Sequence, residues 1–284
     1  MATISGNLIC KIFYDLILCF ATFLPFFILA LVGSPYRRGF FCGDESIRYP
    51  VRSSTVSSSE LYMVSTVLIL LIIIGTEYYR LPRMVRGQQA LKQYSWTLYH
   101  ILILFAFGAT ASVSITSVAK YTVGRLRPHF LALCRPNITC EGRSPVEYIE
   151  NYVCTYENSD ARMSFFSGHS SWAAYTAVFI SMYLQSRLRC PKLVLLKSLL
   201  QSLAFYLALY TALTRISDYK HHPSDVGVGL IVGGLTAYCT VKWAADDLKL
   251  TTWGCLTQRQ NPEDNALIQE NNRSSYSAIE SEEQ

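Results

Sequence analysis

Six long apolar stretches alternate with polar connectors along the chain. They cover roughly residues 12–33, 61–79, 98–119, 170–186, 194–214 and 226–244. Each is close to the about 20 residues that a helix needs to cross a hydrocarbon core. Because lipid offers no hydrogen-bond partners to an irregular backbone, we expect these stretches to be helices. The pattern predicts an all-α fold, an integral membrane bundle of six transmembrane helices, within residues 1–256.

The composition agrees with a membrane protein that ends in a short polar segment. Of the 284 residues, 51% are hydrophobic and 16% are charged. Residues 257–284 are polar, become acidic toward the end and contain few aromatic side chains, which predicts a disordered cytoplasmic tail. The formal charge of +5 is spread over several connectors without a basic patch interleaved with aromatic residues, so no nucleic-acid partner is expected.

The connectors carry signals of sidedness. An excess of Lys and Arg marks the cytoplasmic side of a membrane protein. The second connector has four such residues without an acid between them: Arg80, Arg83, Arg86 and Lys92. The first connector also carries arginines, so the glycosylation sequon Asn137-Ile138-Thr139 in the longest connector decides the orientation. We expect Asn137 to be glycosylated, both chain ends to be cytoplasmic, and the protein to lie in the plasma membrane.

Four of the nine cysteines lie in the two long connectors that an even number of spans puts on one side. They are Cys42, Cys134, Cys140 and Cys154. Cysteines gathered in this way indicate disulfides in an oxidising compartment. Three pairings are compatible with four cysteines, and the sequence does not choose among them.

Three clusters of cationic and imidazole side chains stand beside the ends of the apolar stretches. The first holds Lys120 and Arg127, the second holds Ser167, Gly168 and His169, and the third holds Arg215, His221 and Asp225. Connectors three and five of a six-span bundle share a face, so the clusters can converge in one site at the extracellular or lumenal edge. Positive charge around two imidazoles and a carboxylate suits phosphate-ester chemistry.

Five of these residues are expected to bind the phosphate. Lys120 and Arg127 follow the third span, and Arg215 can direct two donors onto phosphate oxygens. Ser167 and Gly168 precede the fourth span, so a hydroxyl and backbone amides can face an anion at a helix N-terminus.

The two histidines and the aspartate are the expected catalytic residues. His221 is the candidate nucleophile because Asp225, four residues on, can keep one ring nitrogen protonated and leave the other free to attack. Attack on phosphorus would form a phosphohistidine. His169 would act first as the acid for the leaving oxygen and then as the base for water.

The motifs resemble a known family. Lys120-x6-Arg127-Pro128, Ser167-Gly168-His169 and Arg215-x5-His221-x3-Asp225 resemble the three-part signature of the type 2 phosphatidic acid phosphatase superfamily. Residues 38–50 resemble its lipid phosphate phosphatase branch. The resemblance implies a membrane enzyme without metal or cofactor. It would remove phosphate from phosphatidate, lysophosphatidate, sphingosine 1-phosphate and ceramide 1-phosphate at the outer leaflet, with the matching residues in the roles above.

Two positions depart from the family pattern. Phe166 stands where the family often has Pro, and Thr214 stands where it often has Ser. Thr214 retains a hydroxyl, and Phe166 leaves the donor groups intact, so activity is expected.

Alternative interpretations remain open from the sequence. A membrane carrier for anions is expected to have paired half-repeats with broken helices at the bilayer midplane, whereas these charges gather at one edge. A non-catalytic scaffold for anionic lipids would use the long third connector as a partner surface. Glucose 6-phosphate or a polyprenyl diphosphate could replace a lipid monoester as substrate. Gly229-x3-Gly233 permits close helix packing, either within the chain or in a homo-oligomer.

Overall fold

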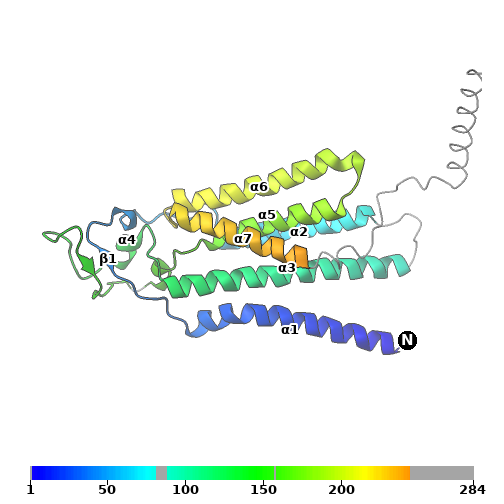
Figure 1. Cartoon of the computed structure of the whole chain (residues 1–284), viewed down its shortest axis with the longest axis horizontal. Coiled ribbons are helices and arrows are strands. Elements are labelled where there is room, and N and C mark those ends of the chain that lie inside the picture. Colours follow the sequence, from blue (N-terminus) through cyan, green and yellow to red (C-terminus); the bar gives the residue numbers. More distant parts are fainter. Residues whose placement is uncertain (1, 81–87, 157, 244–284) are drawn as a thin grey trace, which may run out of the picture.

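Six long helices run side by side in the computed structural model, which describes residues 2–80, 88–156 and 158–243 (Figure 1). They are α1 (Ala2–Val32), α2 (Ser58–Arg80), α3 (Gln88–Val123), α5 (Gly168–Arg187), α6 (Val194–Ser217) and α7 (Pro223–Trp243). The connectors that follow α1, α3 and α6 lie at one end of the bundle, and the N-terminus lies at the other. The all-α fold expected from the apolar stretches is confirmed.

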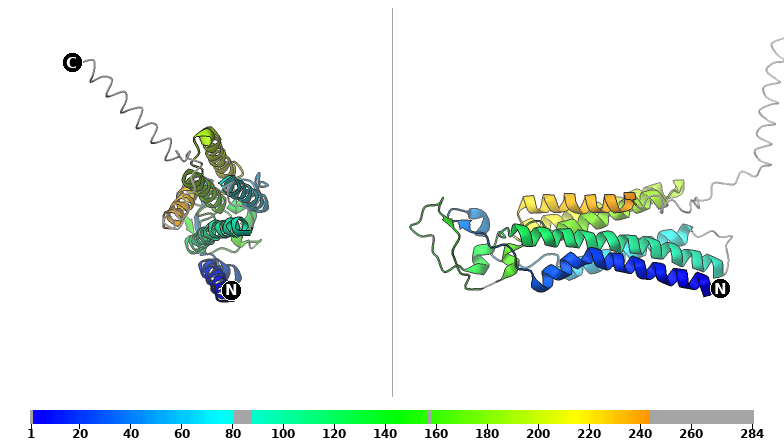
Figure 2. Two further views of the ribbon diagram at one scale, coloured as in Figure 1. Left: turned by 90° about the vertical axis from the view of Figure 1, so that its right-hand side faces the viewer. Right: turned by 60° about the horizontal axis from the view of Figure 1, so that its bottom comes forward.

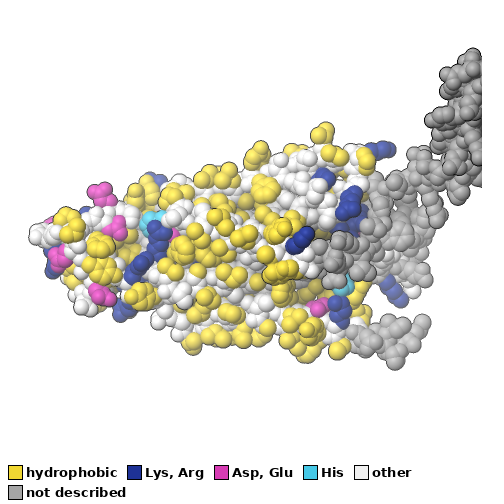
Figure 3. Space-filling model, in the orientation of Figure 1, with side chains coloured by type: hydrophobic (Ala, Val, Ile, Leu, Met, Phe, Trp, Pro, Cys, Tyr) yellow, Lys and Arg dark blue, Asp and Glu magenta, His cyan; other side chains and the backbone are white. Residues whose placement is uncertain are grey.

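The surface and the composition of the helices fit a membrane bundle. On the face shown in Figure 3, hydrophobic side chains cover the middle of the bundle, and charged side chains gather toward its two ends. Among the described residues, five segments are long and apolar enough to cross a membrane. They are Leu8–Val32, Ser58–Arg80, Ala90–Val123, Pro191–Ser217 and Pro223–Trp243.

The sixth helix, α5, does not meet the same criterion, so the expected count of six spans is not confirmed by composition. The structure gives the physical reason. Helix α5 packs against α2, α3, α6 and α7, and most of its residues are buried. A helix surrounded by protein does not need the apolar surface that lipid requires. By contrast, α1 lies at the margin of the bundle and packs against α3 (Figure 2).

A small cap of loops and short elements covers the end of the bundle where the three clusters lie. Strand β1 (Phe40–Phe41) pairs antiparallel with β2 (Tyr148–Ile149), and α4 (Phe130–Cys134) lies between them in sequence. Two 3-10 turns, Glu45–Ile47 and Ser159–Arg162, complete the cap. The buried side chains of Phe40, Ile47 and Phe130 belong to a hydrophobic core of its own.

Two disulfides fix the cap, and they choose one of the three pairings left open by the sequence. Cys42 is bonded to Cys140, and Cys134 is bonded to Cys154. The first joins the α1–α2 connector to the α3–α5 connector. Disulfides across such separations restrict the unfolded chain and so stabilise the fold.

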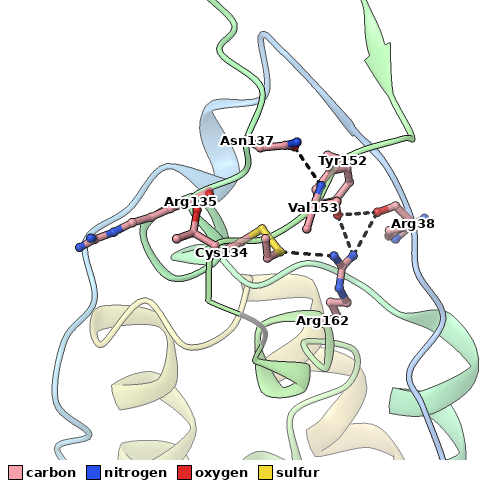
Figure 4. Close-up of a disulfide and its surroundings, with 9 residues drawn as sticks. Arg38, Cys134, Arg135, Asn137, Tyr152, Val153 and Arg162 are labelled. Atoms are coloured by element: carbon pink, nitrogen blue, oxygen red, sulfur yellow. Dashed lines mark hydrogen bonds between the residues drawn. A yellow bond between two sulfur atoms is a disulfide. The ribbon is translucent and has the colours of Figure 1, made fainter.

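The buried guanidinium of Arg162 ties the cap together (Figure 4). It donates to the hydroxyl of Tyr152 at 2.7 Å and lies 3.7 Å from the sulfur of Cys154. It also lies over the ring of Phe130, 5.3 Å from the centroid. Arg162 closes the turn that begins at Ser159, so this network holds in place the segment that carries Asp160.

Helices α5 and α7 approach unusually closely at the two glycines singled out in the sequence. A Cβ added at Gly233 would lie 2.0 Å from the carbonyl oxygen of Ser171, and one at Gly229 would lie 2.6 Å from that of Ser167. The glycine pair therefore serves packing inside the chain. It brings the start of α5 against the start of α7.

Some sequence-based expectations fall outside the described residues. The predicted tail at 257–284 and the cations Arg83 and Arg86 lie there.

Candidate active site

All eight candidate residues lie at the capped end of the bundle. Lys120 is in the last turn of α3, and Arg127 is in the loop after it. Ser167, Gly168 and His169 begin α5, Arg215 is in the last turn of α6, His221 is in the α6–α7 turn, and Asp225 is in the first turn of α7. Helix packing thus converts three remote motifs into one site.

The start of α5 presents an anion-binding arrangement. Ser167 is the N-cap, and its side chain accepts from the amide of Ser170 at 3.3 Å. The first-turn amides of Gly168 and His169 point out of the helix, where a helix has no acceptor of its own. A Cβ at Gly168 would lie 3.7 Å from Nζ of Lys120, so an ammonium stands beside these amides. Together they favour a phosphate at this position.

Arg127 is held between the cap and the α6–α7 turn. Its Nε donates to the carbonyl of Asp160 at 2.8 Å, and Nη2 forms an ion pair with the Asp160 carboxylate at 2.5 Å. Nη1 donates to the carbonyl of Lys220, next to His221, at 3.3 Å. Burial lowers the pKa of Arg127 and the Asp160 carboxylate opposes that shift, and a guanidinium remains charged in either case. The cap thereby places a positive charge beside the imidazole.

Arg215 is almost fully buried and is oriented by neighbours on its own helix end. Its Nη2 donates to Asp218 Oδ2 at 2.9 Å and lies 3.2 Å from the hydroxyl of Thr214. Asp218 in turn accepts from the backbone amide and the hydroxyl of Thr55, both at 2.7 Å. The hydroxyl retained at Thr214, where the family often has Ser, therefore contacts the guanidinium.

His221 is 3% exposed, and its ring is fixed by a backbone carbonyl. Nδ1 lies 2.7 Å from the carbonyl oxygen of Ser164. Because a carbonyl can only accept, Nδ1 carries the proton and Nε2 keeps its lone pair. Burial lowers the pKa of His221 well below its usual value of 6.5, and Arg127 and Lys120 lower it further. The imidazole is thus held neutral, the form that can attack.

The expected direct hydrogen bond between Asp225 and His221 is wrong. The nearest carboxylate oxygen lies 3.9 Å from Nδ1, which is too long for a hydrogen bond. Asp225 is fully buried and instead accepts from the hydroxyl of Ser164 at 2.6 Å and from Nη1 of Arg125 at 2.6 Å. Its own carbonyl accepts from the amide of Ser167 at 3.0 Å. Ser164 therefore lies between Asp225 and His221 and is hydrogen-bonded to both.

His169 has one ring nitrogen in need of a partner. The backbone of Val56 lies next to the imidazole. Its Nε2 is buried, and among the described residues it has no hydrogen-bond partner. A buried polar atom left without a partner is costly, so a ligand that contacts Nε2 would remove a penalty.

Sequence reasoning missed several residues that hold this site. Ser164 contacts His221 through its backbone carbonyl, which every residue type has, and its hydroxyl, which binds Asp225, stands in no motif spacing. Arg125 stands two residues before Arg127 and could have been noticed as a second cation in the first motif. Asp160 and Asp218 lack a motif spacing. No group of three or more His, Cys, Asp or Glu that could hold a metal occurs in the part of the chain that the structure describes.

Comparisons with known proteins agree with the motifs. The PAP2 superfamily matches residues 99–249, which include all eight candidate residues. The chain is 39% identical to phospholipid phosphatase 2 of Mus musculus over 242 residues, 83% of this chain and 86% of that protein. It is 41% identical to phospholipid phosphatase 2 of Homo sapiens over 239 residues, 83% of each. It is 38% identical to phospholipid phosphatase 1 of Rattus norvegicus over 270 residues, 92% and 94% respectively. No solved structure matches the chain.

Proposed function

Because the chain belongs to the PAP2 superfamily and is a lipid phosphatase, we propose that it hydrolyses lipid phosphate monoesters through a phosphohistidine at His221. The substrates are phosphatidate, lysophosphatidate, sphingosine 1-phosphate and ceramide 1-phosphate. The products are the dephosphorylated lipid and inorganic phosphate.

One observation carries this proposal: two imidazoles with complementary nitrogens stand among the same cations. Nε2 of His221 has a lone pair, because Nδ1 donates to Ser164. Nε2 of His169 is buried without a partner in the described chain. Lys120 and Arg127 act electrostatically on both rings. Such a pair can flank one phosphorus atom, with a nucleophile on one side and an acid on the other.

In the first step, Nε2 of His221 forms a bond to phosphorus while the bond from phosphorus to the lipid oxygen breaks. His169 donates its proton to that oxygen, and the lipid leaves as an alcohol. Lys120, Arg127, Arg215 and the amides at the start of α5 stabilise the charge on the phosphoryl oxygens. A bound phosphate dianion also offsets the repulsion between these cations and a protonated His169, so the proton is favoured when the substrate is present.

In the second step, water attacks phosphorus and His169 accepts a proton from it. The bond between phosphorus and Nε2 of His221 breaks, and the electron pair returns to the nitrogen. Inorganic phosphate leaves, and both imidazoles regain their starting states. His169 thus serves as the acid in the first step and as the base in the second.

The extracellular or lumenal side is the proposed location of the site, and lipids of the outer leaflet are the proposed substrates. The two disulfides of the cap suit an oxidising compartment. Asn137 lies exposed in the same cap. The plasma membrane is the proposed residence of the protein.

Phosphate release from a panel of lipid phosphates tests the proposal. The purified full-length protein is incubated in chelator with each lipid monoester, with glucose 6-phosphate and with a polyprenyl diphosphate. We expect release from the lipid monoesters, and none when His221→Ala protein, inserted in the same membrane, replaces the original. Absence of release from every lipid refutes the enzyme scheme, and uptake of intact lipid phosphate by liposomes would favour a carrier. The same lipids given to intact cells report the side of the site.

A further inference from the structure

A cavity of about 880 Å³ lies between α2, α5 and α6, outside the ring of catalytic residues. Helix α5 packs against both α2 and α6. The cavity therefore has α5 as its floor and the other two helices as its walls. Its lining includes Val64, Leu68, Ile72, Ala177, Ala204 and Leu207.

The end of the cavity nearest the cap is continuous with the phosphate site. Thr55 and Val56 both line it. Thr55 binds the carboxylate of Asp218, which holds the guanidinium of Arg215. The backbone of Val56 lies next to the imidazole of His169. Thr55 and Val56 thus line the cavity and also lie beside the proposed catalytic groups: Thr55 near Arg215 through Asp218, and Val56 near His169.

Farther from the cap, the cavity is lined mainly by apolar side chains, which suit a hydrocarbon chain. Small side chains, Ala173 and Ala177 on α5 and Ala204 and Ala208 on α6, make the room that larger residues would fill. Polar side chains occur along the whole lining, but its one charged residue, Glu60, lies at the capped end of α2. A mainly apolar surface with a few polar groups is typical of a ligand site.

The groove is long enough for one lipid chain and is open to the bilayer. Lining residues extend along α2 from Glu60 to Tyr79, and nineteen steps of about 1.5 Å give about 29 Å. A chain that reaches the bilayer midplane spans about 15 Å, half of a hydrocarbon core of about 30 Å, so it fits within the groove. Val64 is 52% exposed and Leu203 is 47% exposed, so the groove opens sideways toward lipid.

We propose that this groove holds one hydrocarbon chain of the lipid substrate while its phosphate lies between His169 and His221. The inference rests on the proposed function and adds the part of the site that recognises a lipid rather than a soluble phosphate ester. Contacts with the chain are remote from the reacting atoms, and they position the phosphate group for attack. A substrate with a chain too short to enter the groove loses this contribution.

Narrowing the groove tests the inference. Two variants, Ala204→Phe on α6 and Val64→Phe on α2, are compared with Ala30→Phe, which places the same ring at an exposed position of α1. Each full-length protein is assayed in one detergent with dioleoyl phosphatidate and with dibutanoyl phosphatidate. We expect kcat/KM for the dioleoyl lipid to fall at least about tenfold in both groove variants. The dibutanoyl lipid and the Ala30→Phe protein should be unaffected.

The outcomes separate the groove from the chemistry. An unchanged preference for the long-chain lipid in both groove variants overturns the inference while leaving the proposed reaction intact. No phosphate release from either phosphatidate by the unaltered protein overturns the proposed reaction itself. Retained turnover of the dibutanoyl lipid shows that a variant is folded.

Photo-crosslinking of the unaltered protein provides a measurement that needs no variant. A phosphatidate with a diazirine near the end of one chain should label peptides of α2, α5 or α6, and excess dioleoyl phosphatidate should prevent the labelling. Labelling elsewhere in the chain overturns the inference. If the groove is labelled but excess dioleoyl phosphatidate does not prevent the labelling, the inference is also overturned, because the occupant would then be an ordinary bilayer lipid.

Discussion

At the scale of single residues, the decisive feature is a backbone carbonyl that sets the protonation of an imidazole. The carbonyl of Ser164 accepts from Nδ1 of His221. Asp225 supports that arrangement from behind through the hydroxyl of Ser164. The carboxylate therefore reaches the proposed nucleophile only through Ser164, unlike the direct carboxylate–imidazole contact of a triad.

The low pKa of His221 predicts where activity is lost in acid. As the proposed nucleophile, His221 can attack only when neutral, and burial together with Arg127 and Lys120 holds its pKa well below 6.5. As the pH falls through 6.5, His221 therefore remains deprotonated, and kcat/KM should decline only at lower pH. His169 must carry a proton in the complex with substrate, so kcat should decline at higher pH and its profile should be bell-shaped.

Both kcat and kcat/KM are measured against pH with two lipid phosphates whose phosphate groups titrate differently. A decline caused by a group of the protein should occur at the same pH with both lipids. A decline caused by the phosphate group of the substrate should occur at a different pH with each lipid. If kcat/KM declines on the acid side at the same pH with both lipids, and that pH lies above 6.5, the assignment of His221 as a neutral nucleophile is contradicted.

Replacement of Asp225 tests its positioning role. Asp225→Asn weakens the support of Ser164 and breaks the ion pair with Arg125. Displacement of the nucleophile is expected to lower kcat by about 100-fold with a smaller effect on KM. Ser164→Ala keeps the carbonyl and removes the hydroxyl, so its loss should be smaller. Thermal unfolding of each solubilised variant controls for stability, and an unaltered kcat in folded Asp225→Asn protein would refute the role.

The sequence predicted the candidate residues of the site but not all of their contacts. The three motifs identify His221, His169 and the cations because those residue types have distinctive chemistry. They do not reveal that Ser164 lies between Asp225 and His221, since spacing along a helix start suggests a direct contact at four residues. The carbonyl of Ser164 comes from another connector, and only tertiary packing brings it to the ring.

At the scale of elements, the contact between α5 and α7 joins the second motif to the third. Gly233 and Gly229 allow the backbones to approach until a side chain would collide with Ser171 or Ser167. The amide of Ser167 then reaches the carbonyl of Asp225. Close packing of these two helices is therefore a condition for the geometry of the site.

Adding one methyl group to this contact should damage the protein. Gly233→Ala places a Cβ 2.0 Å from the carbonyl oxygen of Ser171, and the helices must separate. We expect a loss of about 1–3 kcal/mol in stability and a marked loss of activity. Thermal unfolding and phosphate release measure the two effects.

The matched control is Gly227→Ala on the same helix, where the added Cβ meets no atom within 4 Å. Its stability should be unchanged or slightly higher, because Ala favours a helix over Gly by about 1 kcal/mol. Equal effects of the two substitutions would show that helix propensity, and not the α5–α7 contact, accounts for the loss.

Apolar length predicted where the helices lie, but not which of them face lipid. Helix α6 begins at Val194, where the apolar stretch begins, and α3 begins at Gln88, before its apolar stretch. Polar residues can extend a helix beyond the hydrocarbon core, so hydropathy does not mark its ends. The central position of α5 follows from its contacts with four other helices, which hydropathy alone does not encode.

At the scale of the whole molecule, a disulfide-bonded cap covers one end of the helix bundle. The cap holds both disulfides, Asn137 and the segment with Asp160 that binds Arg127. The four cysteines predicted disulfides on one face, and the structure supplied the pairing, because pairing depends on how two connectors meet in space.

Glycosylation of Asn137 tests the proposed sidedness. Asn137 is exposed, and its hydrogen bond to Val153 uses the side-chain oxygen rather than the nitrogen to which a glycan is attached (Figure 4). Treatment with an endoglycosidase should increase the electrophoretic mobility of the protein from cells. Asn137→Gln should remove that shift, whereas Asn272→Gln, at the sequon in the predicted cytoplasmic tail, should not. A shift that depends on Asn272 alone reverses the orientation.

The central claim is that one phosphoryl group passes through His221 in a pocket assembled from three motifs. Rapid mixing of the protein with phosphatidate, followed by an alkaline quench that preserves phosphohistidine and by mass spectrometry of the peptides, measures this directly. The account predicts a transient phosphoryl group on His221 and none in His221→Ala protein. A phosphoryl group on another residue, or turnover that persists in His221→Ala protein, would contradict it.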